Sequence, residues 1–499
     1  MAKHEALLPH MQEIADLDAV LGLLSWDEET YAPAGARAGR GLQTATLEGL
    51  KHQRLTRPEL GDLIEAALAD PSVTGTDRVM VERFRRTRSL ATRVPEALVK
   101  ALAEARSLAM AAWGKAKNSD DFKAFGPHLE RVVSLTRQRA EALGSPTDEL
   151  YDALLDEYEP GTTAATLRPV FAELRGALVP IVEAIAGAPR PDTSFLEQRF
   201  SSEAQWQFTL RLLEDLGFDM QHGRQDRSAH PFTGSVGQKD VRVTTRIDEE
   251  NPISAIFSTI HECGHGLYEQ GFAPEHHRTP LGVAPSMGIH EGQSRLWENQ
   301  VGRSRAFWQR YLPMMKTYFP GTLDGVDLDT FYRAVNVVEP SLIRTEADEV
   351  TYNLHILLRF ELEQALLTGD LQVDDLPGVW RERMQRDLGI QSEGDTEGCL
   401  QDIHWAWGAI GYFPTYTLGN LYAAQIMATF EAADPNVWAD VAAGRFAPLL
   451  AWLREKIHRR GYTAWAGDIM ADAVGAPLQV APLVRYLKGK FGPLYGLSL

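Results

Sequence analysis

Hydrophobic residues recur at three- and four-residue spacing through the first 218 residues of the chain. The stretch "VPEALVKALAEARSLAMAAWGKAKNS", residues 94–119, shows the pattern well. Such spacing places apolar side chains on one face of an α-helix. Prolines separate the periodic segments, and proline ends or starts a helix because it fixes φ and lacks a backbone donor. We therefore expect residues 1–216 to form a series of helices.

The pattern changes in residues 217–251, where loop-forming residues surround an apolar alternation. Alternation of this kind indicates a β-strand. It involves Val241, Val243, Thr245 and Ile247. A helix should then carry the segment at residues 258–271, and further helices are expected at residues 288–301, 342–367, 377–388, 418–430 and 446–460. The chain should thus be mainly α, with one small β-sheet.

No linker rich in glycine, serine or proline divides the 499 residues, so we expect one large helical body over residues 1–499. Within it, residues 1–216 would form a helical N-terminal part and residues 217–499 the part that carries the chemistry.

The segment "STIHECGHGLYEQG", residues 258–271, carries the strongest chemical signal. Residues four apart share one face of a helix, so His261 and His265 can present two imidazoles to a single metal ion. In zinc peptidases the glutamate after the first histidine, here Glu262, takes a proton from metal-activated water. Cys263 should point away from the ion as a small buried residue.

A third metal ligand must come from elsewhere in the chain. Glu269 lies eight residues after His261, roughly 12 Å along a helix axis, which is too far to share an ion. The segment "GIHEGQSRLWEN" offers His290 or Glu291 on a second helix. We favour Glu291, because a carboxylate completes a two-His, one-Glu set with a position left open for water. The alternative is that Glu291 only complements a helix dipole.

Charge and cysteine content narrow the class of protein. The net charge of −18 and the pI near 5.3 argue against a nucleic-acid partner, which requires clustered Lys and Arg. Two cysteines are too few for a disulfide framework in a chain of this length. Neither a signal peptide nor an apolar stretch of about 18 residues is apparent. We expect a soluble, cytoplasmic protein with no membrane partner.

Six ordered motifs resemble those of the M32 carboxypeptidases, and the resemblance covers essentially the whole chain. They are "HPF" (230–232), "DVRVT" (240–244), "HECGH" (261–265), "HEGQ" (290–293), "IRTEAD" (343–348) and "GCLQDIHW" (398–405). The resemblance implies metal ligands His261, His265 and Glu291, with Glu262 as the general base. It also implies a deep substrate groove like that of neurolysin and angiotensin-converting enzyme, with the metal at its floor.

The same resemblance implies a homodimer that releases C-terminal amino acids from peptides with broad specificity, proline being disfavoured. The substrate would therefore be a peptide with a free C-terminus. Zinc is the default ion for two imidazoles and a carboxylate, although cobalt or manganese suits the same ligands.

Recognition of a free C-terminus calls for an arginine, whose planar fork binds both carboxylate oxygens. Arg344 is the candidate. It begins a polar stripe that the expected helix 342–367 would place on one face, made up of Arg344, Asp348, Tyr352 and His355. Without the resemblance, a solvated Arg344–Asp348 ion pair would be the simpler interpretation. Asp348 could instead hold a ligand histidine in its correct tautomer.

Other polar residues are candidates for contact with substrate. Hydrolysis needs a donor to the developing oxyanion, and "HWAWGAIGYFPTY" offers His404, Tyr412 and Tyr416. We select His404 and Tyr416 as substrate-contacting residues, although aromatic side chains usually pack in the core. His230, Asp240 and Arg242 flank the expected strand, whose edge could bind substrate backbone. A structural Asp240–Arg242 salt bridge is an equal alternative.

Two other functions are compatible with the sequence. An endo-oligopeptidase could share the fold, and it would cleave a C-terminally amidated peptide that an exopeptidase leaves intact. A helical scaffold with a vestigial H-E-x-x-H would bind no stoichiometric divalent ion.

Overall fold

The computed structural model describes residues 3–499, so Met1 and Ala2 of the predicted helical part lie outside it. Over this range the chain is mainly helical. The α-helices are α1 (Leu8–Thr30), α2 (Arg37–Thr56), α3 (Pro58–Leu68), α4 (Gly75–Arg93), α5 (Glu96–Ser119), α6 (Phe122–Leu143), α7 (Leu150–Tyr158), α8 (Ala164–Ala186), α9 (Ser202–Leu216), α10 (Pro252–Glu269), α11 (Met287–Arg295), α12 (Arg305–Tyr318), α13 (Leu328–Ala334), α14 (Tyr352–Thr368), α15 (Leu376–Leu388), α16 (Pro414–Ala433), α17 (Val437–Ala442), α18 (Ala447–Lys456), α19 (Ala466–Val474) and α20 (Ala481–Tyr495).

Short helical turns and three strands complete the secondary structure of this range. The 3-10 turns are η1 (Lys3–Leu7), η2 (Ala34–Ala36), η3 (Ser194–Leu196), η4 (Pro274–His276), η6 (Arg344–Glu346), η7 (Val373–Asp375) and η8 (His458–Arg460), and η5 (Leu296–Gly302) is a π-helical segment. The strands are β1 (Gly223–Arg227), β2 (Thr233–Ser235) and β3 (Val241–Thr245). These elements confirm the prediction of a mainly α chain with one small sheet.

Local chemistry sets many of the helix boundaries. The Ser201 side chain accepts a hydrogen bond from the Ala204 backbone N–H at the start of α9, which satisfies one of the free donors of a first helical turn. Gly217 ends the same helix with a φ of 94°, a left-handed conformation that glycine adopts without a steric penalty.

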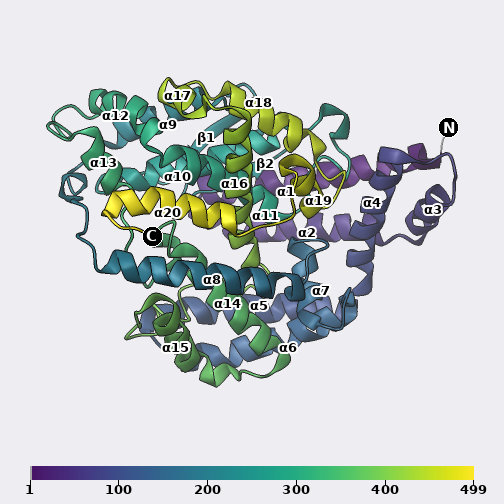
Figure 1. The fold of residues 1–499 in the computed structure, drawn as a ribbon. Coiled ribbons are helices and arrows are strands. Elements are labelled where there is room, and N and C mark those ends of the chain that lie inside the picture. The colour runs from purple at the N-terminus through teal and green to yellow at the C-terminus, as the bar shows by residue number, and fades with distance from the viewer. Residues whose placement is uncertain (1–2) are drawn as a thin grey trace.

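Helix α16 runs through the middle of the molecule, with α11 beside it (Figure 1). In the view of Figure 1, the upper half of the molecule contains α9, α10, α12, α13 and the sheet, and the lower half contains α5, α6, α14 and α15. Helices α3 and α4 project to one side. The main hydrophobic core extends from Leu102 on α5 to Tyr495 on α20. A smaller core joins the N-terminal helices and includes Leu281.

The prediction of a single domain over residues 1–499 stays a prediction. Of the helices described within residues 3–499, none combines the length and apolar character that crossing a bilayer requires.

The sheet is three-stranded, in the order β1-β3-β2, and it packs against α10. Strand β3 pairs with β1 in parallel and with β2 in antiparallel orientation. β3 confirms the predicted strand, except that Ile247 lies beyond its end. β1 and β2 have the sequences "GRQDR" and "TGS", which lack an apolar alternation, so periodicity did not reveal them.

The helix predicted over residues 342–367 begins ten residues later, at Tyr352. Asp348 accounts for the difference. Its side chain accepts hydrogen bonds from the backbone N–H groups of Val350 and Thr351 at 2.9 and 3.0 Å, and such local bonds compete with helix formation. Arg344 therefore lies in η6 and shares no helix face with Asp348. The polar stripe predicted for residues 344–355 was wrong in this respect.

Candidate metal centre

Helix α10 presents the two histidines. It starts at Pro252, whose fixed φ suits a first helical position, and the Asn251 side chain accepts a bond from the Ser254 N–H. His261, Glu262 and His265 lie in the second half of this helix. Because α10 packs against the sheet, its position is set by the core and not by a loop.

Helix α11 crosses α10 at very short distance. A Cβ atom added to Gly264 would lie 2.6 Å from the Cα atom of Ser294 and 2.8 Å from the backbone oxygen of Gln293. No side chain fits in that space, so glycine permits the approach. The approach brings Glu291 of α11 to the two histidines of α10.

The structure brings His261, His265 and Glu291 together. One potential ligand atom from each residue lies within 4.8 Å of the others. Glu291 Oε2 lies 3.7 Å from His261 Nε2 and 3.5 Å from His265 Nε2. These donors are two imidazole nitrogens and one carboxylate oxygen, the set that suits a catalytic zinc ion and leaves a further position open.

His290, the alternative third ligand, points elsewhere. Its Nε2 atom lies 2.9 Å from Glu269 Oε1, and its ring stacks on that of His265 with 4.4 Å between centroids. Glu269 thus supports a neighbour of the metal site and does not reach the site itself. Cys263 is fully buried, and burial raises the pKa of its thiol, which agrees with the packing role predicted for it.

A second carboxylate orients His261. Glu298 of η5 lies with Oε2 2.9 Å from His261 Nδ1, which leaves Nε2 to face Glu291. Carboxylates commonly fix a ligand histidine in this way. Arg295 joins the two acids, since its Nε donates to Glu291 Oε1 at 2.7 Å and its Nη1 to Glu298 Oε2 at 3.2 Å. Such an orienting role was one of the alternatives left open for Asp348, which instead accepts a hydrogen bond from the backbone N–H of Thr351.

The electrostatic environment keeps His265 and Glu291 in the protonation states that bind a cation. Burial and the neighbouring His290 lower the pKa of His265 to about 3, so its imidazole is neutral at physiological pH and offers a lone pair. Burial opposes ionisation of Glu291, but Arg295 and the two α10 histidines outweigh it and lower the pKa of that carboxyl. Glu291 is therefore a carboxylate, as metal ligation requires.

Glu262 is held beside the ligands without joining them. Its Oε2 accepts a hydrogen bond from the Thr233 hydroxyl of β2 at 2.7 Å. Burial raises the pKa of Glu262, and the charge of His261 moderates the effect. A carboxylate whose pKa is raised toward neutrality is suited to accept and return a proton.

Arg344 lies in a buried charge cluster. Its Nε and Nη2 atoms donate to Asp402 Oδ1 at 3.0 and 2.8 Å, and its Nη1 donates to the Tyr352 hydroxyl at 3.1 Å. Arg359 donates to the other oxygen of Asp402 at 2.7 Å. The simpler interpretation of an Arg344–Asp348 pair is thus wrong. Two guanidinium groups share one carboxylate, so the cluster carries one uncompensated positive charge.

His404 and Tyr416 lie beside this cluster. His404 Nε2 is 3.3 Å from the Tyr416 hydroxyl, and the Arg344 guanidinium lies 5.1 Å from the centre of the Tyr416 ring. Burial and Arg344 lower the pKa of His404 to about 4, so this imidazole is neutral. Burial raises the pKa values of Tyr412 and Tyr416, and the charge of Glu291 adds to both shifts.

The residues around the sheet are placed differently. Arg242 donates to both oxygens of Asp240 at 2.8 Å, and its guanidinium lies 4.1 Å from the centre of the Trp26 ring. The structural salt bridge considered above is therefore present. His230 is exposed in the loop between β1 and β2.

Several residues of this site were not predicted from the sequence. Glu298, Arg295 and Thr233 contact the ligands or the candidate base directly, and Asp402 and Arg359 surround Arg344. Glu298 had a detectable signal, since it follows Glu291 by seven residues, two helical turns along the same face.

Comparison with known proteins identifies the family of this chain. The Carboxypeptidase Taq (M32) metallopeptidase family matches residues 6–491. Thermostable carboxypeptidase 1 of Thermus thermophilus is 44% identical, with 99% of each chain covered. Carboxypeptidase 1 of Bacillus subtilis is 38% identical, with 97% of each covered. The crystal structure of the M32 carboxypeptidase from Deinococcus radiodurans R1 superposes with a TM-score of 0.98 at 42% identity, covering 100% of both chains. The chain belongs to the Carboxypeptidase Taq (M32) family and is a metallocarboxypeptidase, a hydrolase of peptides.

Proposed function

We propose that the protein is a zinc-dependent carboxypeptidase that releases single amino acids from the C-termini of peptides, with broad specificity and with proline disfavoured. The observation that carries the proposal is the convergence of His261, His265 and Glu291 within 4.8 Å, with Glu262 directly adjacent. The family match supports the reaction, and the donor set supports zinc, with cobalt as a substitute.

A bound zinc ion would supply Lewis acidity, which polarises a carbonyl group and lowers the pKa of water to about 7. Glu262 would take the proton of the attacking water and later deliver it to the leaving amine. Thr233 holds the Glu262 carboxylate in place through its 2.7 Å hydrogen bond. Glu298 keeps His261 in the tautomer that directs Nε2 toward Glu291.

For the substrate C-terminus we assign Arg344. Its fork is already bound to Asp402, but the net positive charge of the Arg344–Asp402–Arg359 cluster attracts a carboxylate, and one N–H of Nη1 remains free. His404 and Tyr416 would contact the substrate, with the Tyr416 hydroxyl donating to the oxygen that gains charge during attack.

The sheet would bind the substrate backbone. β2 is an edge strand, and an edge presents unpaired N–H and C=O groups to an extended peptide. His230 follows β1 at one end of the sheet, and the Asp240–Arg242 pair stiffens the other end. The deep groove, the homodimer and the cytoplasmic location belong to the same proposal.

A single substitution tests the mechanism. Glu262→Gln preserves size and the bond from Thr233 but cannot accept the proton, so kcat should fall by a factor of about 10³ or more while one zinc ion per chain remains bound. Metal content is measured on the same sample. If the variant turns over peptide at the wild-type rate, the proposed role of Glu262 is refuted.

A second comparison tests the mode of cleavage. The enzyme is incubated with a peptide and with its C-terminal amide, and the masses of the products are followed over time. We expect stepwise loss of single residues from the free peptide and no reaction of the amide. Cleavage of the amide at internal bonds would show an endopeptidase instead.

A further inference from the structure

A second pocket lies away from the metal ligands, between α16 and α20. Its volume is about 560 Å³. The α16 wall consists of Ala424, Met427, Ala428 and Glu431. Ala424 and Glu431 lie three or four residues from both Met427 and Ala428, so the four residues share one helix face. Ala424 and Met427 are buried, whereas Glu431 lies at the exposed edge. This wall is apolar in its depth and acidic at its rim.

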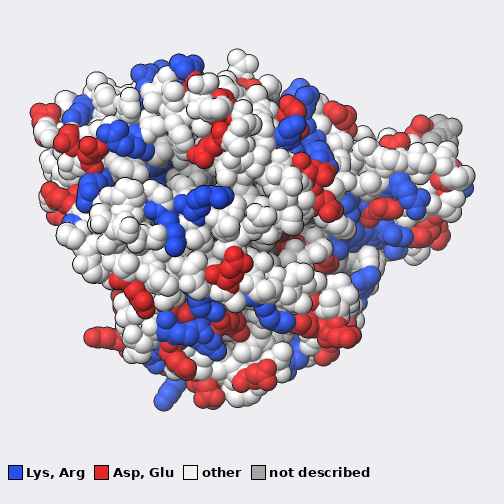
Figure 2. Space-filling model, viewed as in Figure 1, with Lys and Arg blue, Asp and Glu red and all other residues white. Residues whose placement is uncertain are grey.

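The α20 wall faces it with the opposite charge. Helix α20 contains Arg485, Lys488 and Lys490 and no acidic residue, and Figure 2 shows basic side chains gathered over this helix. Arg485 and Lys490 line the pocket. Lys490 is buried, its side chain 6% exposed, and it pairs with Glu349 and donates to the Tyr486 hydroxyl at 3.1 Å. Its third N–H remains for a ligand.

The charges at the rim are only partly matched. Arg305 is paired with Asp329 at 2.7 Å, and Glu431 accepts a bond from the Trp438 indole at 2.9 Å. Glu431 and Arg485 both line the pocket, one on each wall. Partial desolvation raises the pKa of Glu431, and the charge of Arg485 acts in the opposite direction. Within residues 3–499, Arg485 itself makes no ion pair within 4.0 Å.

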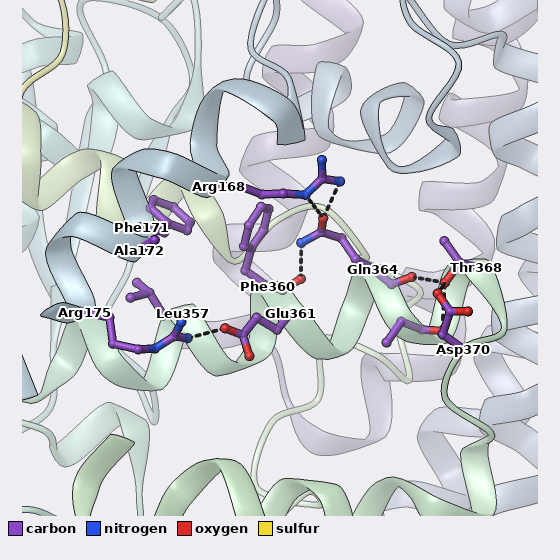
Figure 3. Close-up of a pocket in the computed structure, with 11 residues that line it drawn as sticks. Arg168, Phe171, Ala172, Arg175, Leu357, Phe360, Glu361, Gln364, Thr368 and Asp370 are labelled. Carbon is purple, nitrogen blue, oxygen red and sulfur yellow. Dashed lines mark hydrogen bonds and ion pairs between the residues drawn. The ribbon is translucent and has the colours of Figure 1, made fainter. Parts of the chain in front are cut away.

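A cavity between α8 and α14 provides a contrast (Figure 3). It also contains two arginines, but each is already engaged. Arg168 donates to Gln364 at 3.0 Å, and Arg175 lies 2.5 Å from Glu361. Arg175 has an acidic partner and Arg168 an amide partner in that cavity, whereas Arg485 makes no ion pair of this kind within the described residues.

We propose that the pocket between α16 and α20 binds a free α-amino acid with an apolar or aromatic side chain. Arg485 and the remaining N–H of Lys490 would hold the α-carboxylate, and Glu431 on the opposite wall would hold the α-ammonium. Trp438 and Met427 would cover the side chain. A lone organic anion fits less well, because the carboxylate of Glu431 repels it.

The carboxypeptidase reaction itself supplies this ligand, since each turnover releases a free amino acid. The pocket also reaches the metal centre through η5. Gln300 of η5 lines it, and the Tyr486 hydroxyl, which donates to Glu349 Oε2 at 2.7 Å, also lies 3.1 Å from the backbone oxygen of Asn299 in the same segment. Glu298, which orients His261, is the preceding residue. The pocket is thus placed to bind the released amino acid next to η5, the segment that carries Glu298.

Binding of L-phenylalanine to the full-length protein tests the proposal by isothermal titration calorimetry. Gly489→Phe fills the pocket, because a Cβ there meets no atom within 4 Å and the glycine lies inside α20. Gly176→Phe is the matched control, at an exposed glycine inside α8 that also has no atom within 4 Å. We expect the pocket variant to weaken binding at least tenfold and the control to leave it unchanged. Equal binding by both variants and the wild type would overturn the proposal.

Ligand analogues on the wild-type protein test the two charges without any variant. Phenylalanine amide lacks the carboxylate, and 3-phenylpropanoate lacks the ammonium. Each should bind about tenfold more weakly or worse, as expected for the loss of one hydrogen bond to a charged group. Arg485→Met and Glu431→Gln should produce matching losses for phenylalanine. If 3-phenylpropanoate or the amide binds as tightly as phenylalanine, or if phenylalanine does not bind at all, the proposal fails.

Discussion

Gly419→Ala should weaken the metal centre although it changes no polar group. Gly419 lies in α16, and a Cβ atom there would come within 2.5 Å of Glu291 Cγ, 2.7 Å of its Cβ and 3.0 Å of its backbone carbon. Carbon atoms pack at about 3.5–4.0 Å, so the methyl group overlaps the metal ligand by roughly 1 Å. Either Glu291 or the whole of α11 must move.

The size of the effect follows from two opposing terms. Alanine inside a helix is more stable than glycine by about 0.5–1 kcal/mol, whereas overpacking a dense interior costs about 1–3 kcal/mol. We expect a net loss of about 1–2 kcal/mol in the free energy of unfolding. Displacement of Glu291 should also lower zinc affinity by about tenfold, which corresponds to about 1.4 kcal/mol.

Gly176→Ala is the matched control for this prediction. Gly176 is solvent-exposed and lies away from the ends of α8, and its new methyl group meets no atom within 4 Å. Only the greater helix propensity of alanine then remains, so the variant should be slightly more stable than the wild type. Both variants are compared by chemical denaturation and by zinc competition with a chelator. If Gly419→Ala gains stability like the control and binds zinc as the wild type does, the close contact with Glu291 does not exist.

Three further predictions concern charge. Glu298→Gln removes the carboxylate that orients His261, so metal affinity in a chelator competition should fall about 10–100-fold; an unchanged affinity would assign that role elsewhere. Burial raises the pKa of Glu159 to about 8, above its unfolded value, so the folded state holds a proton that the unfolded state releases and stability falls from about pH 4.5 to pH 8. In Glu159→Gln the loss of stability that comes from Glu159 should be absent when the thermal midpoints of variant and wild type are compared across that pH range. Identical pH profiles of the two proteins would contradict the prediction. Arg344→Met leaves Asp402 paired with Arg359, so it should fold but raise KM for free peptides about 10–100-fold; a wild-type KM would exclude contact with the C-terminus.

Local spacing was enough to find the centre of the site and the type of fold. The i, i+4 relation of His261 and His265 depends only on helix geometry, and the apolar periodicity of the long helices gave the mainly α class. The choice of Glu291 as the third ligand needed a chemical argument, because His290 next to it is an equally good metal ligand by residue type. Only the packing of α11 on Gly264 decides which of the two side chains faces the histidines.

The features that were missed depend on contacts that local sequence does not contain. Asp402 reaches Arg344 across 58 positions, and no periodicity links them. The start of α14 was predicted ten residues early, because the backbone hydrogen bonds of Asp348 interrupt an otherwise helical pattern. β1 is polar along its length and is a strand only through its pairing with β3.

The π-helical segment η5 makes the geometry of the metal centre sensitive to the number of residues in this segment. A π-helical turn contains one more residue than an α-helical turn, and each residue of an α-helix advances the chain by about 100° around the axis. A deletion of one residue in Leu296–Gly302 would therefore let an ordinary α-helix form, yet it would swing either Glu298 or Arg303 out of alignment. Point mutations in η5 can be compensated by neighbouring side chains, whereas a shortened η5 would need the whole following chain to rotate.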